Sequence, residues 1–198
     1  MKVWFCLAAI PLAGQPIWMV PDEFQVSPGQ RVSVTFRSAA GRTPGPEQLR
    51  SAALYAPQAA YNVVNLRRDG EAVLGEATAK PEGTLALGVC AGPERRDCAK
   101  ALLVSREPGG NVATRPLGLR FEIVPEKDPH KLRKGACLPV RVLFEGRPVV
   151  GAVLDSGSRS GPEGQASVAI GEDVPFRMSA SQDGFTTTLV FAPAAAKD

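Results

Sequence analysis

The chain has 198 residues, including 20 Gly, 18 Pro and one His; 44% of its residues are hydrophobic and its formal net charge is +3. This apolar content excludes an intrinsically disordered chain, the nearly balanced charge argues against a nucleic-acid partner, and one imidazole is too few for a His-rich metal site. Because Gly and Pro are frequent in turns, their number predicts a turn-rich chain, which is typical of all-β proteins.

The first 14 residues have the layout of a secretory signal. One positive charge, Lys2, precedes an apolar run at residues 3–13 that ends in small residues. This run is too short to cross a bilayer, and no later run approaches the roughly 18 apolar residues of a membrane helix. We therefore predict a signal peptide at residues 1–14 and a periplasmic or secreted protein that does not span the membrane. The alternative is a buried first strand with Trp4 and Phe5 in the core.

Apolar and polar residues alternate through most of the remaining chain. In residues 31–37, Val32, Val34 and Phe36 share one face while polar side chains occupy the other, which predicts a half-buried strand. Similar runs predict strands over residues 61–67, 71–77, 84–89, 117–123, 138–144, 149–154, 166–170, 174–180 and 186–191. The one predicted helix is short, residues 46–55, with Pro46 near its start and Pro57 after its end.

Three cysteines remain if the signal, which contains Cys6, is removed. Cys90 ends one strand-like run, Cys98 begins the next, and the seven residues between them form a predicted hairpin loop. Cysteines at the base of a hairpin face each other at bridging distance, so we predict a Cys90–Cys98 disulfide in an oxidising compartment. Cys137 is then an unpaired thiol, which we expect to be buried like a small hydrophobic residue.

Zinc binding by the three thiols and His130 is an alternative to the disulfide. The chain lacks the C-x2-C spacing of structural zinc sites, which argues against it. His130 lies between Pro129 and Lys131 in a charged stretch, and we interpret it as a solvated linker residue.

That stretch, residues 125–135, separates two strand-rich halves. It contains two prolines and many charges, and it has no apolar period. We therefore predict an N-terminal β-sandwich domain at residues 15–125 and a C-terminal one at residues 126–198. The expected fold class is all-β, with two small immunoglobulin-like or transthyretin-like sandwiches and at most one short helix.

A family resemblance rests on four segments: IWMVP at residues 17–21, CAKAL at 98–102, RPLGLRFEIVP at 115–125 and LPVRVLFEGRP at 138–148. With these segments the chain resembles a family of exported bacterial proteins described as a domain of unknown function, some of which are named nickel- or cobalt-uptake accessory proteins. The resemblance implies a transthyretin-like or carboxypeptidase-regulatory-like second domain, export and no enzymatic activity.

The chain departs from that family at the start of the mature sequence. Members commonly carry a His there, whereas this chain has Gly14, Gln15 and Pro16. One imidazole cannot make a nickel site without other ligands. We therefore assign no residue to a metal site and expect no cofactor.

Asp155 lies in the one motif that suggests an enzyme. An apolar run leads into Asp155-Ser156-Gly157, the local signature of aspartic peptidases, in which two carboxylates share a proton. No second such motif follows an apolar strand. We interpret Asp155 as a strand-end residue with a local side-chain hydrogen bond, keep the peptidase as a remote alternative, and predict no catalytic residues.

The basic clusters do not indicate nucleic-acid binding. They consist of residues 67–68, 95–96 and 131–134, and no aromatic side chains are interleaved with their charges. We interpret them as solvated loop charges. The sequence therefore predicts a non-enzymatic binding or accessory protein that contacts an envelope or membrane protein. A structural envelope module or a carbohydrate- or protein-interaction module is the alternative.

Overall fold

A computed structural model describes residues 16–39, 43–79, 83–107 and 109–195. Within these residues the chain forms strands and three short 3-10 helices: η1 (Pro46–Leu49), η2 (Pro93–Arg95) and η3 (Pro129–Lys131). The all-β sandwich class predicted from the sequence is confirmed. The predicted signal peptide lies outside the described residues.

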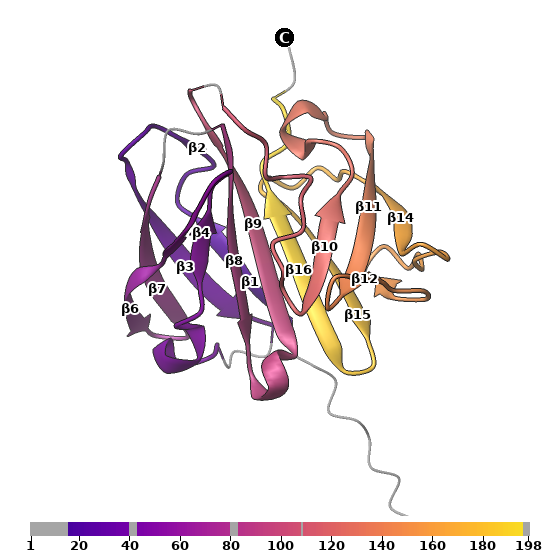
Figure 1. Ribbon diagram of the computed structural model, residues 1–198, viewed down its shortest axis with the longest axis horizontal. Coiled ribbons are helices and arrows are strands. Elements are labelled where there is room, and N and C mark those ends of the chain that lie inside the picture. The colour runs from indigo at the N-terminus through magenta and orange to yellow at the C-terminus, as the bar shows by residue number, and fades with distance from the viewer. Residues whose placement is uncertain (1–15, 40–42, 80–82, 108, 196–198) are drawn as a thin grey trace, which may run out of the picture.

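The strands form three sheets (Figure 1). Sheet A has the order β1 (Ile17–Pro21), β3 (Arg31–Ser38), β7 (Ala72–Thr78) and β6 (Val64–Asp69). Sheet B has the order β13 (Val153–Leu154), β15 (Phe176–Gln182), β16 (Phe185–Phe191), β9 (Asp97–Ser105), β8 (Thr84–Ala91), β4 (Ala53–Tyr55) and β5 (Ala60–Asn62), and β2 (Gln25–Val26) pairs with β9. In sheet C, β10 (Phe121–Pro125) pairs with β11 (Cys137–Phe144), which also pairs with β12 (Arg147–Pro148) and β14 (Gln165–Ala169).

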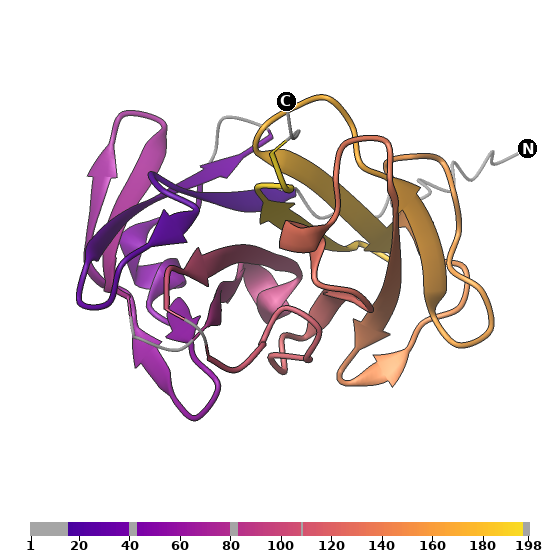
Figure 2. The ribbon, with the colours of Figure 1, turned by 90° about the horizontal axis from the view of Figure 1, so that it is seen from above.

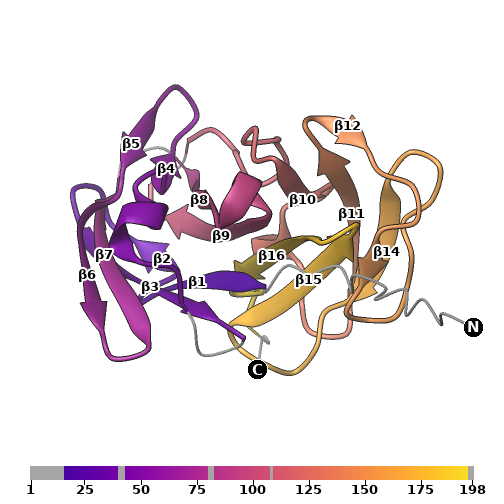
Figure 3. The ribbon, with the colours of Figure 1, turned by 90° about the horizontal axis from the view of Figure 1, so that it is seen from below.

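Sheet B is the middle layer of the molecule (Figures 2 and 3). All eight residues of β8 are buried. Successive side chains of a strand point to opposite faces. Leu85 and Leu87 accordingly pack into the core shared with sheet A, whereas Ala86 and Cys90 pack into the core shared with sheet C. The fold therefore has three layers and two hydrophobic cores, one on each face of sheet B.

One parallel strand pair crosses the predicted domain boundary. β16, from the predicted C-terminal domain, pairs with β9 from Thr186↔Asp97 to Val190↔Ala101. Sheet B therefore contains strands from both predicted domains, while η3 lies at the expected boundary. The division into residues 15–125 and 126–198 stays a prediction.

Four predicted elements were wrong in type or extent. The single strand predicted at residues 61–67 is divided between β5 in sheet B and β6 in sheet A. The segment predicted as a helix at residues 46–55 contains η1 and then β4, because β4 pairs with β8 and buries Ala53 and Leu54. The predicted strand at residues 117–123 begins only at Phe121, because the backbone N–H groups of the preceding residues turn toward a buried carboxylate. Of the strand predicted at residues 149–154, only β13 forms.

Candidate functional site

The predicted disulfide is present in the structure. Cys90 on β8 and Cys98 on β9 are directly opposite partners in the antiparallel ladder, and their sulfur atoms are bonded. The bridge closes the loop that contains η2. A disulfide at this position indicates an oxidising compartment. It also removes two of the thiols that zinc binding would need.

Cys137 is exposed, so the expectation that it is buried was wrong. It begins β11, in which Leu138, Val140 and Val142 face the core. The alternation of side chains along the strand therefore places Cys137 on the solvent face, together with Arg141.

His130 is not a solvated linker residue, and this prediction too was wrong. Its Nδ1 lies 2.9 Å from the carbonyl oxygen of Ala192, and its ring meets Phe191 edge-on. Burial lowers the pKa of the imidazole, partly offset by the hydrogen bond to Ala192 and by the charge of Asp128. Nε2 is buried and has no hydrogen-bond partner among the described residues. The segment after β16 covers this side chain, which local sequence could not indicate.

Two hollows flank the turn between β15 and β16. The first, of about 500 Å3, is lined by β13, by the residue after it, by the end of β15 and by Pro16. The second, also about 500 Å3, is lined by Phe121, Phe144 and residues 147–150. Both hollows share Gln182, Asp183 and Phe185, so the turn forms a common wall between them. We take the two hollows as the candidate functional site.

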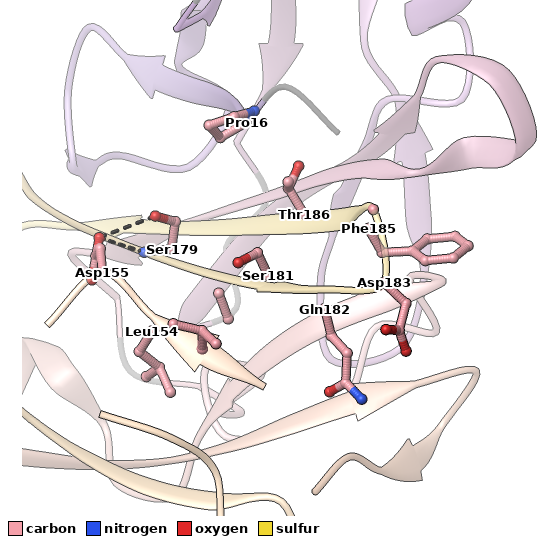
Figure 4. Close-up of a pocket in the computed structure, with 12 residues that line it drawn as sticks. Pro16, Leu154, Asp155, Ser179, Ser181, Gln182, Asp183, Phe185 and Thr186 are labelled. Atoms are coloured by element: carbon pink, nitrogen blue, oxygen red, sulfur yellow. Dashed lines mark hydrogen bonds between the residues drawn. The ribbon is translucent and has the colours of Figure 1, made fainter. Parts of the chain in front are cut away.

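Asp155 lies in the first hollow, and its carboxylate is held by β15 (Figure 4). Oδ2 accepts hydrogen bonds from the backbone N–H of Ser179 at 2.8 Å and from its hydroxyl at 3.1 Å. The expected local hydrogen bond was therefore wrong, because the donor lies 24 residues away in the chain. Among the described residues no second aspartate bonds to this carboxylate, so the structure gives it a positioning contact and not the shared proton of a peptidase pair.

The β15–β16 hairpin carries different polar side chains on its two sides. Ser181 and Thr186 are directly opposite partners, and Figure 4 shows Thr186 on the side where Pro16 lies and Gln182 on the other side. The Thr186 hydroxyl donates to Asp97 at 2.8 Å. Burial raises the pKa of Asp97, an effect that this hydrogen bond partly offsets. Two residues that line the first hollow, Ser179 and Thr186, therefore have hydroxyls that are held by carboxylates.

Aromatic rings form part of the wall of the second hollow, and two arginines outside its lining pack against one of these rings. Phe144 and Phe185 meet edge-to-face with centroids 4.9 Å apart. The guanidinium of Arg120 lies 5.0 Å from the centroid of Phe185, and that of Arg96 lies 5.5 Å from it. Cation–π contacts of this kind hold both arginines against the ring. Val150, on the rim, is 59% exposed. The second hollow therefore combines an exposed apolar residue on its rim with a wall of packed aromatic rings.

The basic clusters lie apart from one another, and ion pairs or backbone carbonyls occupy part of their charge. Arg96 pairs with Glu94 at 2.8 Å, and Lys134 pairs with Glu172 at 3.0 Å. Arg68 donates to the carbonyl oxygen of Thr43. Residues 67 and 68 lie on strand β6. The interpretation of this cluster as loop charge was therefore wrong.

The two hollows were not expected from the sequence. The Asp183-Gly184 turn is a recognisable hairpin signal, and Phe185 interrupts a polar stretch directly after it. The other lining residues come from β15, from β10 to β13 with the residues that follow β12 and β13, and from Pro16, which only the folded chain brings together. Within the described ranges no three His, Cys, Asp or Glu residues gather as a metal site would require.

Part of the chain matches a known protein family whose function is unknown. The family model of DUF4198, a domain of unknown function, matches residues 91–187, just under half of the chain and the part that runs from the end of β8 into β16. No curated protein sequence matches the chain. No helix in the described part of the chain is long and apolar enough to cross a membrane.

Several solved structures share a distant likeness with the chain. The adhesin FdeC of Escherichia coli is 16% identical, with 93% of this chain and 65% of that one covered and a TM-score of 0.33. The adhesin InvE of Yersinia pseudotuberculosis is 11% identical, with 89% and 58% covered and a TM-score of 0.31. The tandem Ig repeats of Dlar are 12% identical, with 90% and 98% covered and a TM-score of 0.29. Likeness at this level carries no inference about function.

Proposed function

We propose that the protein is a non-enzymatic binding module, periplasmic or secreted, that acts as an accessory protein in nickel or cobalt uptake by contacting an envelope protein. The observation that carries the binding role is the pair of hollows that share the β15–β16 turn. Asp155 and Ser179 fix one side of this turn, and the stack of Arg120 on Phe185 fixes the other. A preformed concave site with few polar groups is typical of binding sites. The disulfide supports export.

The link to nickel or cobalt comes from the family resemblance. The proposal assigns no metal ligand in this chain, and the protein partner would carry the metal. Calorimetric titration of the purified protein with nickel and cobalt tests this point. We expect no heat of binding at high micromolar metal, and stoichiometric binding would overturn the accessory role in favour of a direct one.

A complementation experiment tests the function and the site together. In the source bacterium, deletion of the gene should lower the accumulation of radioactive nickel or cobalt severalfold, and the wild-type gene should restore it. Val150→Arg introduces a charge on the rim of the second hollow and should fail to restore uptake. Val64→Arg, at a residue of similar exposure (53% against 59%) on β6, is the matched control and should restore it.

The possible outcomes separate the two parts of the proposal. Unchanged metal accumulation after deletion overturns the link to metal uptake. Full restoration by Val150→Arg overturns the second hollow as the contact site. Both variants should be present in the periplasmic fraction at wild-type levels, since a largely exposed valine contributes little to folding.

Carbohydrate is a second candidate ligand, favoured by the lining of the first hollow. Three of the residues that line it, Ser179, Ser181 and Thr186, carry hydroxyl groups, and such groups hydrogen-bond polyhydroxylated ligands. Titration of 15N-labelled protein with oligosaccharides of the cell wall should shift the amide resonances of Ser181 and Thr186. Unchanged spectra at millimolar oligosaccharide would exclude this candidate.

A further inference from the structure

β14 forms an open edge of sheet C. β11 pairs with it from Cys137↔Ala169 to Arg141↔Gln165, and no strand among the described residues pairs with its other side. Figures 1 and 3 show β14 at the margin of the molecule, on the side of β11 opposite to β10. An open edge of this kind presents N–H and C=O groups to which another strand can add.

Two hydrogen bonds just outside the strand determine which residues of β14 bond to β11. The N–H of Val142 donates to the carbonyl oxygen of Gly164 at 2.8 Å, and the N–H of Ile170 donates to that of Ala136 at 2.9 Å. Hydrogen-bonded and non-bonded residues alternate along an antiparallel pair. The even-numbered residues of this segment therefore bond to β11, and the odd-numbered residues direct their backbone groups outward.

Pro139 provides an independent check of this assignment. It lies opposite Ser167, has no N–H group, and its carbonyl oxygen accepts from Glu126 on the other side of β11. Ser167 therefore has no backbone partner in β11. Its N–H and C=O groups face away from the sheet, as do those of Ala169. The carbonyl of Gln165 also faces out and accepts from Gly161, which limits the open edge to the second half of β14.

β14 lacks the protections that other edges of this fold carry. Its sequence, QASVA, contains no charge and no proline. In sheet A, the edge strand β6 carries Arg67 and Arg68 and has a register shift. In sheet B, β13 is only two residues long. Charge, irregularity and shortness are the usual means of blocking strand addition, and β14 has none of the three, so it is an edge able to accept a strand.

The charges that flank β14 indicate the chemistry of the partner. Glu163 precedes the strand and Asp173 follows it, and neither has an ion pair with another described residue. Glu172 is 88% exposed and shares its charge with Lys134. If a second copy of this chain added antiparallel about Ser167, Glu163 would lie opposite Gly171 of that copy and one position from its Glu172, and like charges would oppose the pairing.

We infer that β14 binds an extended segment of another protein by strand addition, and that this segment has a short uncharged stretch with Lys or Arg at both ends. Backbone hydrogen bonds to Ser167 and Ala169 supply the affinity, and the acidic flanks select the partner. This inference rests on the proposed function, since it names the kind of envelope partner that a binding module would contact.

A designed peptide tests the inference without knowledge of the natural partner. The probe is acetyl-KVTVTVK-amide, added to 15N-labelled protein without residues 1–14. The amide resonances of Ser167 and Ala169 should shift, and their hydrogen exchange should slow at least tenfold. The amides of Ala166 and Val168 already bond to β11 and should change little in exchange rate. Absence of any change at Ser167 and Ala169 at millimolar peptide overturns the inference.

Matched controls separate strand addition from other contacts. The same peptide with N-methyl groups on alternate residues cannot pair and should not bind. The version with Glu at both ends should bind at least tenfold more weakly, and equal binding overturns the charge selection. Ser167→Pro removes an outward N–H without removing a bond to β11, so it should abolish binding while Ser167→Ala retains it. If Ser167→Pro does not fold, the N-methyl comparison on the wild-type protein still decides.

Two further measurements distinguish this inference from its alternatives. Concentration-dependent dimers in sedimentation that Ser167→Pro abolishes would show that a second copy occupies the edge, which overturns the inference of a different partner. Val150→Arg should bind the peptide like the wild type. If that variant loses metal uptake but still binds the peptide, the loss is caused by the hollow and not by β14. The proposed function and the inference about β14 can therefore fail separately.

Discussion

Lys100 and Glu122 form a fully buried ion pair between β9 and β10. Their charged atoms lie 2.8 Å apart, and the side chains are 0% and 1% exposed. The ammonium group also donates to the carbonyl oxygen of Arg115, and the carboxylate accepts from the N–H groups of Leu117 and Leu119. Burial lowers the pKa of Lys100, partly offset by the charge of Glu122. The pair therefore holds the segment before β10 against the central sheet.

Lys100→Met should destabilise the protein strongly, because it leaves the Glu122 carboxylate buried without its counter-charge. We expect a loss of about 3–5 kcal/mol in the free energy of unfolding. Adding Glu122→Gln should recover at least about 1 kcal/mol, since the amide oxygen still accepts from Leu117 and Leu119 and no charge remains. Urea unfolding of the two single variants and the double variant measures this coupling.

The matched control is Arg141→Met, which breaks an ion pair of the same length with Glu126 at the surface. Its cost should stay below about 1 kcal/mol. A Lys100→Met variant as stable as this control would contradict the assignment of the buried pair as a structural anchor.

His130 should make stability fall at acidic pH. Its pKa is lowered in the folded protein by burial, so the unfolded chain binds the proton more readily. The His130 contribution is therefore fully present above the unfolded pKa, about 6.5. It is lost as the pH falls from there toward the folded pKa. Urea midpoints measured from pH 8 to pH 5 should show this loss for the wild type.

His130→Asn provides the control for this pH dependence. Its side-chain amide can donate to the Ala192 carbonyl in place of Nδ1, but it does not titrate. The difference in unfolding free energy between wild type and variant should shrink as the pH falls below about 6.5. A difference that is constant across this range would contradict the lowered pKa.

Removal of the Cys90–Cys98 disulfide should destabilise the protein by about 2–3 kcal/mol, because the bridge closes a short loop in the unfolded chain. The variant with both cysteines replaced by Ala measures this loss. Cys137→Ala is the control, and its effect should stay within about 0.5 kcal/mol because the residue is exposed. Thiol titration of the denatured protein without residues 1–14 should find one free thiol, and three would contradict the disulfide.

The alternation of apolar and polar residues was sufficient to predict strands that have one buried and one exposed face. The alternation in β3 predicted the bounds of this strand to within one residue. The spacing of Cys90 and Cys98 predicted the disulfide between them. Local sequence failed at β4, because the segment carries helical signals but pairs with β8 as a strand. The apolar run of β8 indicated a strand, but a run of this kind does not say which sheets cover its two faces.

The candidate site was less predictable than the fold because its contacts join distant segments. Asp155 was singled out for a motif, yet its bonds go to Ser179 on another strand. His130 was assigned to solvent because its sequence neighbours are charged, whereas Ala192 and Phe191 cover it from the end of the chain. Hollows arise where such segments meet, so only the fold as a whole shows them.

The β9–β16 pair leads to a last prediction about the two halves of the chain. A fragment of residues 126–198 contains β16 but neither β9 nor β10, so it exposes an edge of sheet B and one of sheet C. It also loses apolar residues of the second core, including Leu102, Phe121 and Ile123. We expect it to lack cooperative thermal unfolding, and mixing it with residues 15–125 should restore a folded complex. A cooperative transition of the isolated fragment, followed by calorimetry, would instead establish it as an independent domain, in which case the parallel pair is an interface between two folded units.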